Sequence, residues 1–185
     1  MTLPQIGTLR VVPALEHLEL VPAPVASALA AWAEADSRVA GQVGITEIDP
    51  ADSDTAVLVE KYGLSWDTSA NCVLVAGKRE GQERVAAVLV RADTKADVNG
   101  VVRRLLDVRK ASFWPTERAV AASGMEYGGI TPVGVPESWR ILIDRRVVAT
   151  PSVLIGAGTR AAKIAVPGEL FATLPRAEII DHLGR

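Results

Sequence analysis

The residues best suited to chemistry lie in one short glycine-rich stretch, Gly128-Gly129-Ile130-Thr131-Pro132. Paired glycines adopt backbone conformations with positive φ and let another molecule approach the main chain closely. Pro132 fixes its own φ and restricts Thr131 to extended geometry. A segment that is flexible at one end and rigid at the other can direct several backbone N–H groups toward one point, where they bind an anion or polarise a carbonyl. A simple tight turn between two elements is the alternative that this spacing leaves open.

Asp144 is the second candidate, because it directly follows a short apolar strand predicted over residues 140–143. This strand comes soon after the glycine-rich stretch in the sequence, so the carboxylate could orient a substrate amine or a water molecule. The same carboxylate could instead cap a turn or pair with Arg145 or Arg146. The sequence alone does not separate these roles.

Other catalytic and ligand-binding patterns are absent from the sequence. It has no G-x-S-x-G nucleophile elbow, no Walker phosphate loop and no H-E-x-x-H zinc motif. Cys72 lies in an apolar run, which favours a buried thiol over a nucleophile. His17 and His182 are far apart in the chain, and Gly156-Ala157-Gly158 lacks the third glycine of a dinucleotide site. The sequence therefore predicts neither a metal site nor a cofactor.

The composition is that of one globular domain with an uneven charge distribution. Of the 185 residues, 49% are apolar and 23% are charged, and the net charge is −2. Residues 1–70 hold three Lys/Arg and ten Asp/Glu, whereas the remainder is mildly basic and compatible with a phosphate-bearing partner. The single cysteine, the lack of a signal pattern and the shortness of the longest apolar run (residues 21–33) predict a cytoplasmic protein.

Helices and strands that would position the candidate residues alternate irregularly along the chain. Residues 1–23 are predicted to form an extended arm, and hairpin-like strand pairs occur among the helical crossovers, which favours a mixed α+β fold with a mixed sheet curled toward a barrel. The predicted helices cover residues 24–35, 50–62, 94–106, 115–123 and 167–174. The predicted strands cover residues 71–76, 84–91, 110–113, 140–143, 152–155 and 161–166, with a polar hairpin loop at 77–83 and a last short element at 179–183.

Some helix ends carry clear signals. Asp49 followed by Pro50 is typical of a helix start, and Gly63 would end that helix. Thr94 opens a capping-box pattern for the helix that follows it. Gly124 is placed to end the helix that precedes the glycine-rich stretch.

The glycine-rich segment resembles the YbaK/EbsC family, whose pattern is a Gly, three variable residues, Gly-Gly-(Ile/Val)-(Ser/Thr)-Pro and a further Gly. Gly124, the stretch 128–132 and Gly134 match it, and the strand ending in Asp144 and the turn 156–160 extend the likeness. The family comprises bacterial aminoacyl-tRNA deacylases related to the editing domain of prolyl-tRNA synthetases. The resemblance implies a barrel-like mixed sheet packed with helices, formed by a YbaK-like aminoacyl-tRNA deacylase domain over residues 41–185 and preceded by an N-terminal extension over residues 1–40.

The resemblance also implies an activity, the hydrolysis of the ester that joins a wrongly attached amino acid to the tRNA 3′ end. Gly128 and Gly129 would hold the carbonyl and stabilise the oxyanion, while a water, activated by the ribose hydroxyl of the substrate, would attack. The implied catalytic set is Gly128, Gly129, Asn71 and Asp144. The implied substrate-binding residues are Ile130, Thr131, Pro132, Val133, Gly156, Gly158, Thr159 and Arg160, with Ile130 and Val133 limiting the size of the amino acid. The implied partner is aminoacyl-tRNA, with no role for DNA or a membrane. A separate interpretation is that the acidic N-terminal segment docks on an aminoacyl-tRNA synthetase.

One position departs from the family pattern. The family usually has a lysine where this chain has Asn71, and asparagine can donate a hydrogen bond but carries no charge. Lys78, on the same predicted strand, would lie roughly 20 Å away at the usual rise per residue. Two alternatives remain: an active deacylase, or an altered or inactive family member that binds tRNA or an aminoacyl-adenosine-like ligand.

Overall fold

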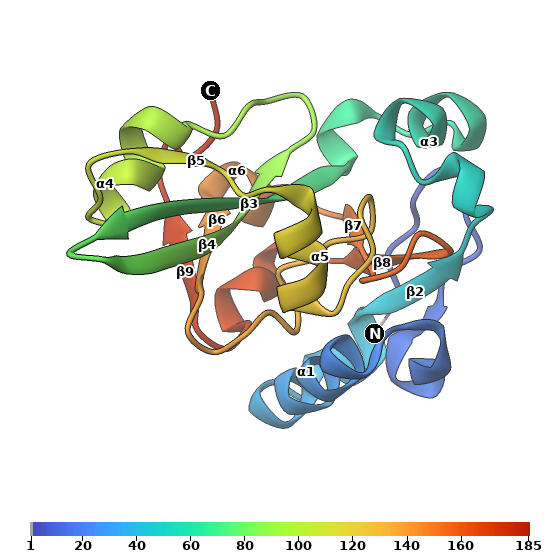
Figure 1. The fold of residues 1–185 in the computed structure, drawn as a ribbon. Coiled ribbons are helices and arrows are strands. Elements are labelled where there is room, and N and C mark those ends of the chain that lie inside the picture. The colour runs from blue at the N-terminus through green and yellow to red at the C-terminus, as the bar shows by residue number, and fades with distance from the viewer. Residues whose placement is uncertain (1) are drawn as a thin grey trace.

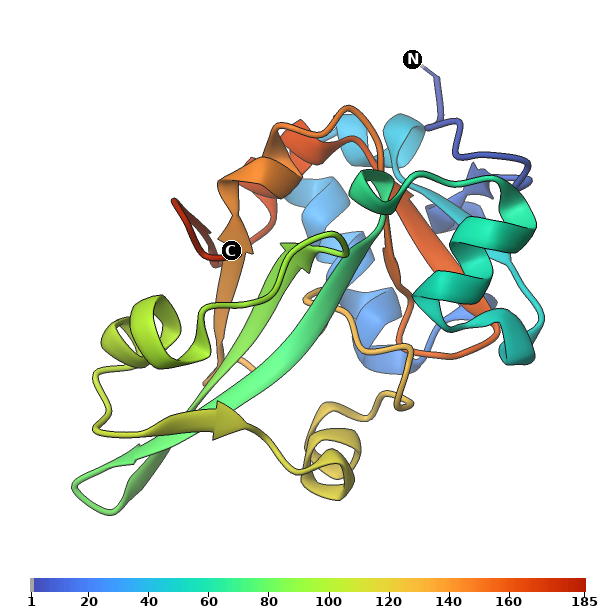
Figure 2. The same cartoon turned by 90° about the horizontal axis from the view of Figure 1, so that it is seen from above.

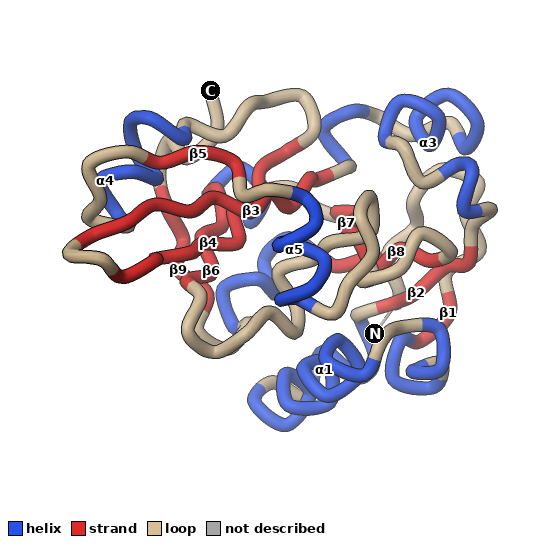
Figure 3. The backbone as a smooth tube through the Cα atoms, viewed as in Figure 1, coloured by secondary structure: helices blue, strands red, loops and turns tan. Residues whose placement is uncertain are grey.

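The computed structural model describes residues 2–185, which form two β-sheets surrounded by short helices (Figure 1). The predicted mixed α+β fold is confirmed. Figure 3 shows the strands in two groups, and within the described residues neither sheet closes into a barrel.

The smaller sheet has four strands in the order β1-β2-β8-β7, and every neighbouring pair is antiparallel. Its strands are β1 (Val12–Pro13), β2 (Gly44–Glu47), β7 (Val153–Gly156) and β8 (Ala162–Val166). Every residue of β7 and β8 is buried, which explains why both read as continuous runs of mainly apolar residues in the sequence. The one charged residue in these two strands is Lys163.

The larger sheet has five strands in the order β5-β3-β4-β6-β9 and is mixed, because β6 pairs in parallel with both β4 and β9. The strands are β3 (Ala70–Arg79), β4 (Gln82–Arg91), β5 (Ala111–Phe113), β6 (Arg140–Asp144) and β9 (Ala177–Ile180). The last of these replaces the short element predicted over residues 179–183.

The β3–β4 hairpin is longer than predicted and projects away from the smaller sheet (Figure 2). The polar loop predicted over residues 77–83 is wrong, because the turn needs only Glu80 and Gly81. Both residues have positive φ (53° and 80°), which is the geometry of a tight two-residue hairpin turn. The polar residues on either side of this turn therefore continue the two strands.

The two sheets meet at one end of β3. Ser69, immediately before β3, forms an isolated parallel bridge with Leu154 of β7. The first residues of β3 therefore lie beside the smaller sheet, although β3 and β7 are far apart in the sequence. This junction positions the candidate site described below.

Helix α1 (Ala23–Ala35) occupies the predicted position and packs into the main core. Val25, Leu29 and Trp32 recur at helical spacing and are completely buried. The Trp32 indole N–H donates a hydrogen bond to the Thr173 hydroxyl at 3.0 Å. Helix α1 thus shares its core with the sheets, and a domain boundary near residue 40 stays a prediction.

Two helix starts differ from the prediction because a second cap lies downstream of the first. Asp49 caps only a short 3₁₀ turn (Pro50–Asp52), and Asp54 caps the α-helix that follows, α3 (Thr55–Tyr62). Likewise Asp97, not Thr94, accepts the amide hydrogen bonds that open the next helical segment. That segment is a π-turn followed by α4 (Val98–Val102 and Arg103–Leu105).

The remaining helices are short. Helix α5 (Thr116–Ser123) ends at Gly124 and α3 ends at Gly63, both with left-handed φ as predicted. The others are α2 (Arg38–Gln42), α6 (Arg145–Val148) and 3₁₀ turns at Ala14–Glu16, Leu18–Leu20, Trp66–Thr68 and Gly168–Thr173, the last of which lies where a helix over 167–174 was expected. Over residues 2–185, no helix is both long and apolar enough to cross a membrane.

Candidate functional site

An open pocket of about 380 Å³ lies where the two sheets meet. Its volume falls in the range of small-molecule sites. Its walls come from the start of β3, from β7 and β8, from the segment that leads into α3, and from the glycine-rich stretch. Four segments that are distant in the sequence therefore converge on one cavity.

The glycine-rich stretch is packed main chain against main chain on the turn 156–160. The Gly129 carbonyl accepts a hydrogen bond from the Gly158 N–H at 2.7 Å, and the Gly129 N–H donates to Glu126 O at 3.0 Å. A Cβ atom on Gly129 would lie 2.4 Å from Thr159 O. The prediction that these two glycine-containing segments form one site is consistent with this packing, which only glycine permits.

Glu126 fastens the two segments together, a role that the sequence analysis missed. Its carboxylate accepts hydrogen bonds from the Arg160 N–H at 2.7 Å and from the Thr159 hydroxyl at 3.1 Å. Its own N–H donates to Gly158 O at 2.8 Å. Gly158 and Thr159 therefore hold the loop in place and do not line the pocket, whereas Arg160 and Gly156 do line it.

Two backbone donors of the glycine-rich stretch are left for a ligand. Gly128 and Ile130 both line the pocket, and neither amide donates to another group within residues 2–185. Gly128 has a φ of +87°, so a side chain there would be strained. The donors available for an oxyanion are thus those of Gly128 and Ile130, because the Gly129 amide already has a partner.

The rest of the motif lies behind the pocket. Thr131, Pro132 and Val133 are buried, and Val133 belongs to the main core. They are not among the pocket residues, so the expected apolar limit on substrate size would come from Ile130 and not from Val133. Their burial anchors the glycine-rich stretch to the core of the protein.

Asn71 opens onto the pocket at the beginning of β3. Its side-chain carbonyl accepts a hydrogen bond from the Thr55 hydroxyl at 3.0 Å. Its amide NH₂ has no partner in the described part of the chain and can donate to a ligand. The position implied by the family resemblance therefore faces the cavity, with a neutral donor in place of a charge.

A charge enters the same pocket from the other sheet, on Lys163 of β8. Only 6% of this residue is exposed, and its ammonium donates to Ser53 O at 3.1 Å and Gly128 O at 3.3 Å. Burial, reinforced by the positive charge of Arg160 and opposed by Asp54, lowers the pKa of Lys163 to about 8. Lys163 was not among the predicted site residues, although a lysine inside an apolar strand is a visible signal in the sequence.

Two hydroxyl groups in the pocket wall lack partners. The side-chain oxygens of Ser53 and Ser69 are buried, and neither forms a hydrogen bond within residues 2–185. Buried polar groups are nearly always hydrogen-bonded to protein or to water. Ser53 and Ser69 therefore add polar groups to the pocket wall, but their hydroxyl oxygens are not accessible from the cavity.

Cys72 also lines the pocket, but its chemistry is not that of a nucleophile. Burial raises the pKa of the Cys72 thiol to about 12, against a weaker opposing effect from a backbone hydrogen bond. The thiol is therefore protonated at neutral pH, whereas the thiolate is the reactive form. Within residues 2–185, no three His, Cys, Asp or Glu side chains gather in a way that could hold a metal ion.

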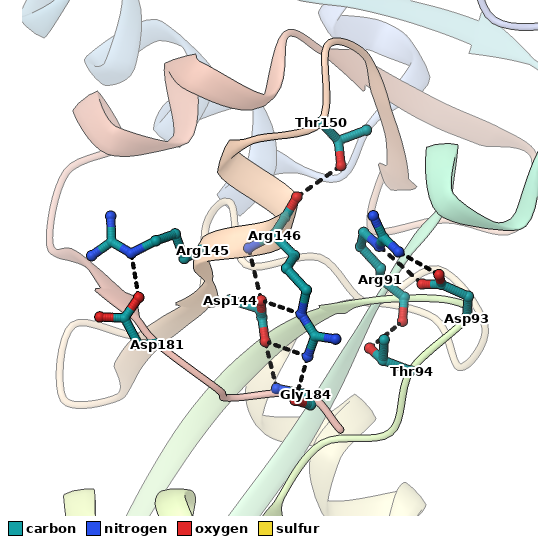
Figure 4. Close-up of polar contacts among 9 residues, drawn as sticks. All are labelled: Arg91, Asp93, Thr94, Asp144, Arg145, Arg146, Thr150, Asp181 and Gly184. Atoms are coloured by element: carbon teal, nitrogen blue, oxygen red, sulfur yellow. Dashed lines mark hydrogen bonds and ion pairs between the residues drawn. The ribbon is translucent and has the colours of Figure 1, made fainter.

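Asp144 does not line this pocket and belongs to a hydrogen-bond network of its own (Figure 4). Its carboxylate caps α6 by accepting the Arg146 N–H at 2.8 Å, and it also accepts bonds from the Arg146 guanidinium and the Gly184 N–H. Burial alone would raise the pKa of Asp144, but these hydrogen bonds outweigh it and lower the pKa. Of the two roles open from the sequence, the structure shows the capping and ion-pairing one, so Asp144 is not carried forward as a catalytic residue.

We expect Asp144→Asn to make the folding stability less sensitive to acid and to leave any reaction in the pocket intact. The folded pKa lies below the ordinary value of 3.8, so the carboxylate stabilises the fold above about pH 4 and this stabilisation is lost as the pH falls through the folded pKa. Urea unfolding at pH 7 and at pH 3 should therefore differ less for the variant than for the native protein. The exposed Glu60→Gln provides the control. Loss of more than about 100-fold in a pocket-dependent reaction would contradict the assignment, because that is the usual effect of removing a general base.

The residues that line the pocket lie within the part of the chain that matches a known protein family. Residues 49–174 match the sequence profile of the aminoacyl-tRNA editing domain. The hypothetical protein APE2540 superposes with a TM-score of 0.72 at 16% identity, over 85% of this chain and 99% of its own. A protein proposed as a trans-editing enzyme for prolyl tRNA synthetase gives 0.65 at 20% identity, over 86% and 97%. Identities this low show likeness of fold alone, and no curated protein matches the sequence.

Proposed function

This chain belongs to the aminoacyl-tRNA editing domain family, and from that premise we propose that it is a deacylase that hydrolyses the ester of mischarged tRNA in trans. The match covers residues 49–174, which contain every segment that lines the pocket. Membership confirms the family resemblance based on the glycine-rich motif. The amino acid, the tRNA and the reaction itself are parts of the proposal.

The observation that carries the proposal is the pair of unpartnered amides at Gly128 and Ile130 in the wall of a polar cavity. Ester hydrolysis places negative charge on the carbonyl oxygen as the tetrahedral intermediate forms. Fixed backbone donors at that point stabilise the charge without any reorganisation during the reaction. The hydrogen bonds of Gly129 and Glu126 hold these donors in place before the substrate arrives.

The reaction needs no nucleophilic side chain. A water oxygen attacks the carbonyl carbon of the aminoacyl ester and gives a proton to the neighbouring ribose hydroxyl of the substrate, which passes its own proton to the ester oxygen. The bond between the carbonyl carbon and the ribose oxygen then breaks, and that oxygen leaves as a hydroxyl group. This route is consistent with the protonated state of Cys72 and with the absence of Asp144 from the pocket lining.

The experiment that tests the proposal is single-turnover hydrolysis of a broad panel of mischarged tRNAs. We expect accelerated release of at least one amino acid from its mischarged tRNA, and no acceleration for the correctly charged counterpart. Failure to accelerate hydrolysis of every member of the panel would refute the deacylase proposal. The spontaneous rate, measured without protein, is the baseline for each substrate.

The alternative function is binding without turnover, and Asn71 is the observation that favours it. A neutral donor at this position can bind an aminoacyl-adenosine end while failing to supply the charge that the family usually places there. Tight binding of an amide-linked aminoacyl-adenosine analogue, with no hydrolysis of any tRNA in the panel, would select this function. Asn71→Lys would then be expected to gain hydrolytic activity.

We also propose that the acidic N-terminal segment provides the contact to an aminoacyl-tRNA synthetase. Deleting residues 1–40 is an unsuitable test, because Val25, Leu29 and Trp32 belong to the core. Charge reversal of the exposed Glu16, Glu19 and Glu34 leaves that core intact. Unchanged synthetase binding by the triple variant would refute this docking proposal.

A further inference from the structure

The pocket holds a buried cation that no acidic group neutralises. Lys163 forms no ion pair within 4.0 Å in the part of the chain that the structure describes. Its two protein partners, Ser53 O and Gly128 O, are neutral carbonyl groups. An ammonium group has three donor hydrogens, so one remains for a ligand. Buried charges are normally paired, and an unpaired one in a cavity calls for an electron-rich occupant.

This cation lies close to the free amides of the glycine-rich stretch. The ammonium of Lys163 is 3.3 Å from the carbonyl oxygen of Gly128, whose N–H group is one of the two unpartnered donors. Gly128, Ile130 and Lys163 line the same cavity. Two residues with free backbone donors and one charged donor therefore line the same cavity, with Gly128 in direct contact with the ammonium.

The position of Lys163 suits contact with the aminoacyl group better than contact with the tRNA backbone. Lys163 is 6% exposed and extends from a fully buried strand, so it lies in the depth of the cavity. A phosphodiester that continues into a polynucleotide must stay at the mouth. The small aminoacyl ester is the part of the substrate that can reach the depth of the cavity.

We propose that Lys163 is a catalytic residue whose ammonium binds the ester carbonyl oxygen and stabilises its developing negative charge together with the Gly128 and Ile130 amides. This inference rests on the proposed deacylase function. The positive charge that is missing at Asn71, on β3, is then supplied by Lys163, on β8, which lines another wall of the same pocket. Asn71 is then no sign of lost activity, because the cation reaches the same cavity from the other sheet.

The electrostatic surroundings of Lys163 give the proposal a pH signature. Arg160, from the turn 156–160, lowers its pKa and Asp54, before α3, raises it, while its strand partners Thr46 and Gly156 are uncharged. With a pKa of about 8, the ammonium is lost as the pH rises through that value. Protein-dependent hydrolysis, corrected for the spontaneous rate, should therefore fall above about pH 8.

The test is a comparison of Lys163→Met, Lys163→Arg and the double variant Asn71→Lys/Lys163→Met. We expect Lys163→Met to lower kcat/KM by about 100-fold or more, the usual effect of losing one oxyanion donor, and to remove the fall above pH 8. Lys163→Arg should keep part of the activity up to higher pH, because a guanidinium remains charged. Asn71→Lys in the Lys163→Met background should recover activity by about 10-fold or more, since it returns a charge to the cavity.

The control is Lys78→Met, which removes an exposed lysine from the far end of β3. Far-UV circular dichroism and thermal melting check that each variant is folded. Lys163→Met with native kcat/KM and an unchanged pH profile would overturn the inference while leaving the deacylase function in place. A folded Lys163→Met variant that loses activity and is not rescued by Asn71→Lys would also count against a purely electrostatic role.

Binding measurements separate a failure of this inference from a failure of the proposed function. If the native protein hydrolyses no tRNA in the panel, affinity for the amide-linked aminoacyl-adenosine analogue is compared between native protein and Lys163→Met. Weakening by about 10-fold or more supports the contact between Lys163 and the carbonyl oxygen, although the deacylase function has failed. Equal affinity, or no binding by either protein, overturns the inference.

Discussion

Replacing Gly129 with alanine is expected to reduce hydrolysis of the mischarged substrate by about 100-fold or more, the effect of misplacing oxyanion donors. The added Cβ would lie 2.4–2.8 Å from the O, C and N atoms of Thr159. These are backbone atoms, which cannot rotate away as a side chain can. The glycine-rich stretch must then separate from the turn 156–160, which breaks the bond from the Gly158 N–H and shifts the Gly128 and Ile130 amides.

The matched control for this variant is Gly81→Ala in the β3–β4 turn. Gly81 also has a special backbone conformation, with a φ of +80°, but nothing lies within 4 Å of an added Cβ. The control should lose some stability through strain and keep the hydrolysis rate of the native protein. Native activity in Gly129→Ala would mean that the packing of the two segments does not position the catalytic donors.

The largest expected effect on stability comes from Trp32→Ala. Trp32 is fully buried in α1, stacks on Phe171 with ring centroids 6.1 Å apart and donates a hydrogen bond to Thr173. Truncation of a buried tryptophan costs about 3–5 kcal/mol through lost burial and the cavity left behind. For a chain of this length, that loss lowers the melting temperature by roughly 6–20 °C, which calorimetry measures.

A second tryptophan provides the comparison. Trp66 is 46% exposed, so Trp66→Ala should change the free energy of unfolding by about 0.5 kcal/mol or less. The Trp32→Ala prediction also tests whether the whole N-terminal segment stabilises the fold. This segment packs closely on the loops near the pocket, where Pro22, Pro24 and Val25 contact Gly134 and Gly158. Equal effects of the two substitutions would show that α1 contributes little to the fold.

Features specified by neighbouring residues could be predicted from the sequence. The helix ends at Gly63 and Gly124 follow from the left-handed conformation that glycine adopts without strain, and α1 follows from the spacing of its apolar residues. The starts of the helical segments were misplaced where Asp49 and Asp54, or Thr94 and Asp97, compete as caps. Local chemistry identifies each cap but does not rank the two.

The site was predictable only in part, because its walls come from different sheets. The glycine-rich motif identified one wall. The pairing of β8 with β2 and β7 brings Lys163 into the same cavity, and no local pattern encodes that pairing. Conversely, Asp144 is close to the motif in sequence, but its carboxylate caps α6 and does not line the pocket. Short sequence separation did not predict a shared site.

A crystal structure with the amide-linked aminoacyl-adenosine analogue bound would locate the ester-like carbonyl group directly. We expect the analogue in the pocket between the sheets, with its carbonyl oxygen within hydrogen-bond distance of the Gly128 amide and the Lys163 ammonium. An analogue seated elsewhere, or bound in this pocket with its carbonyl oxygen turned away from both donors, would contradict this expectation.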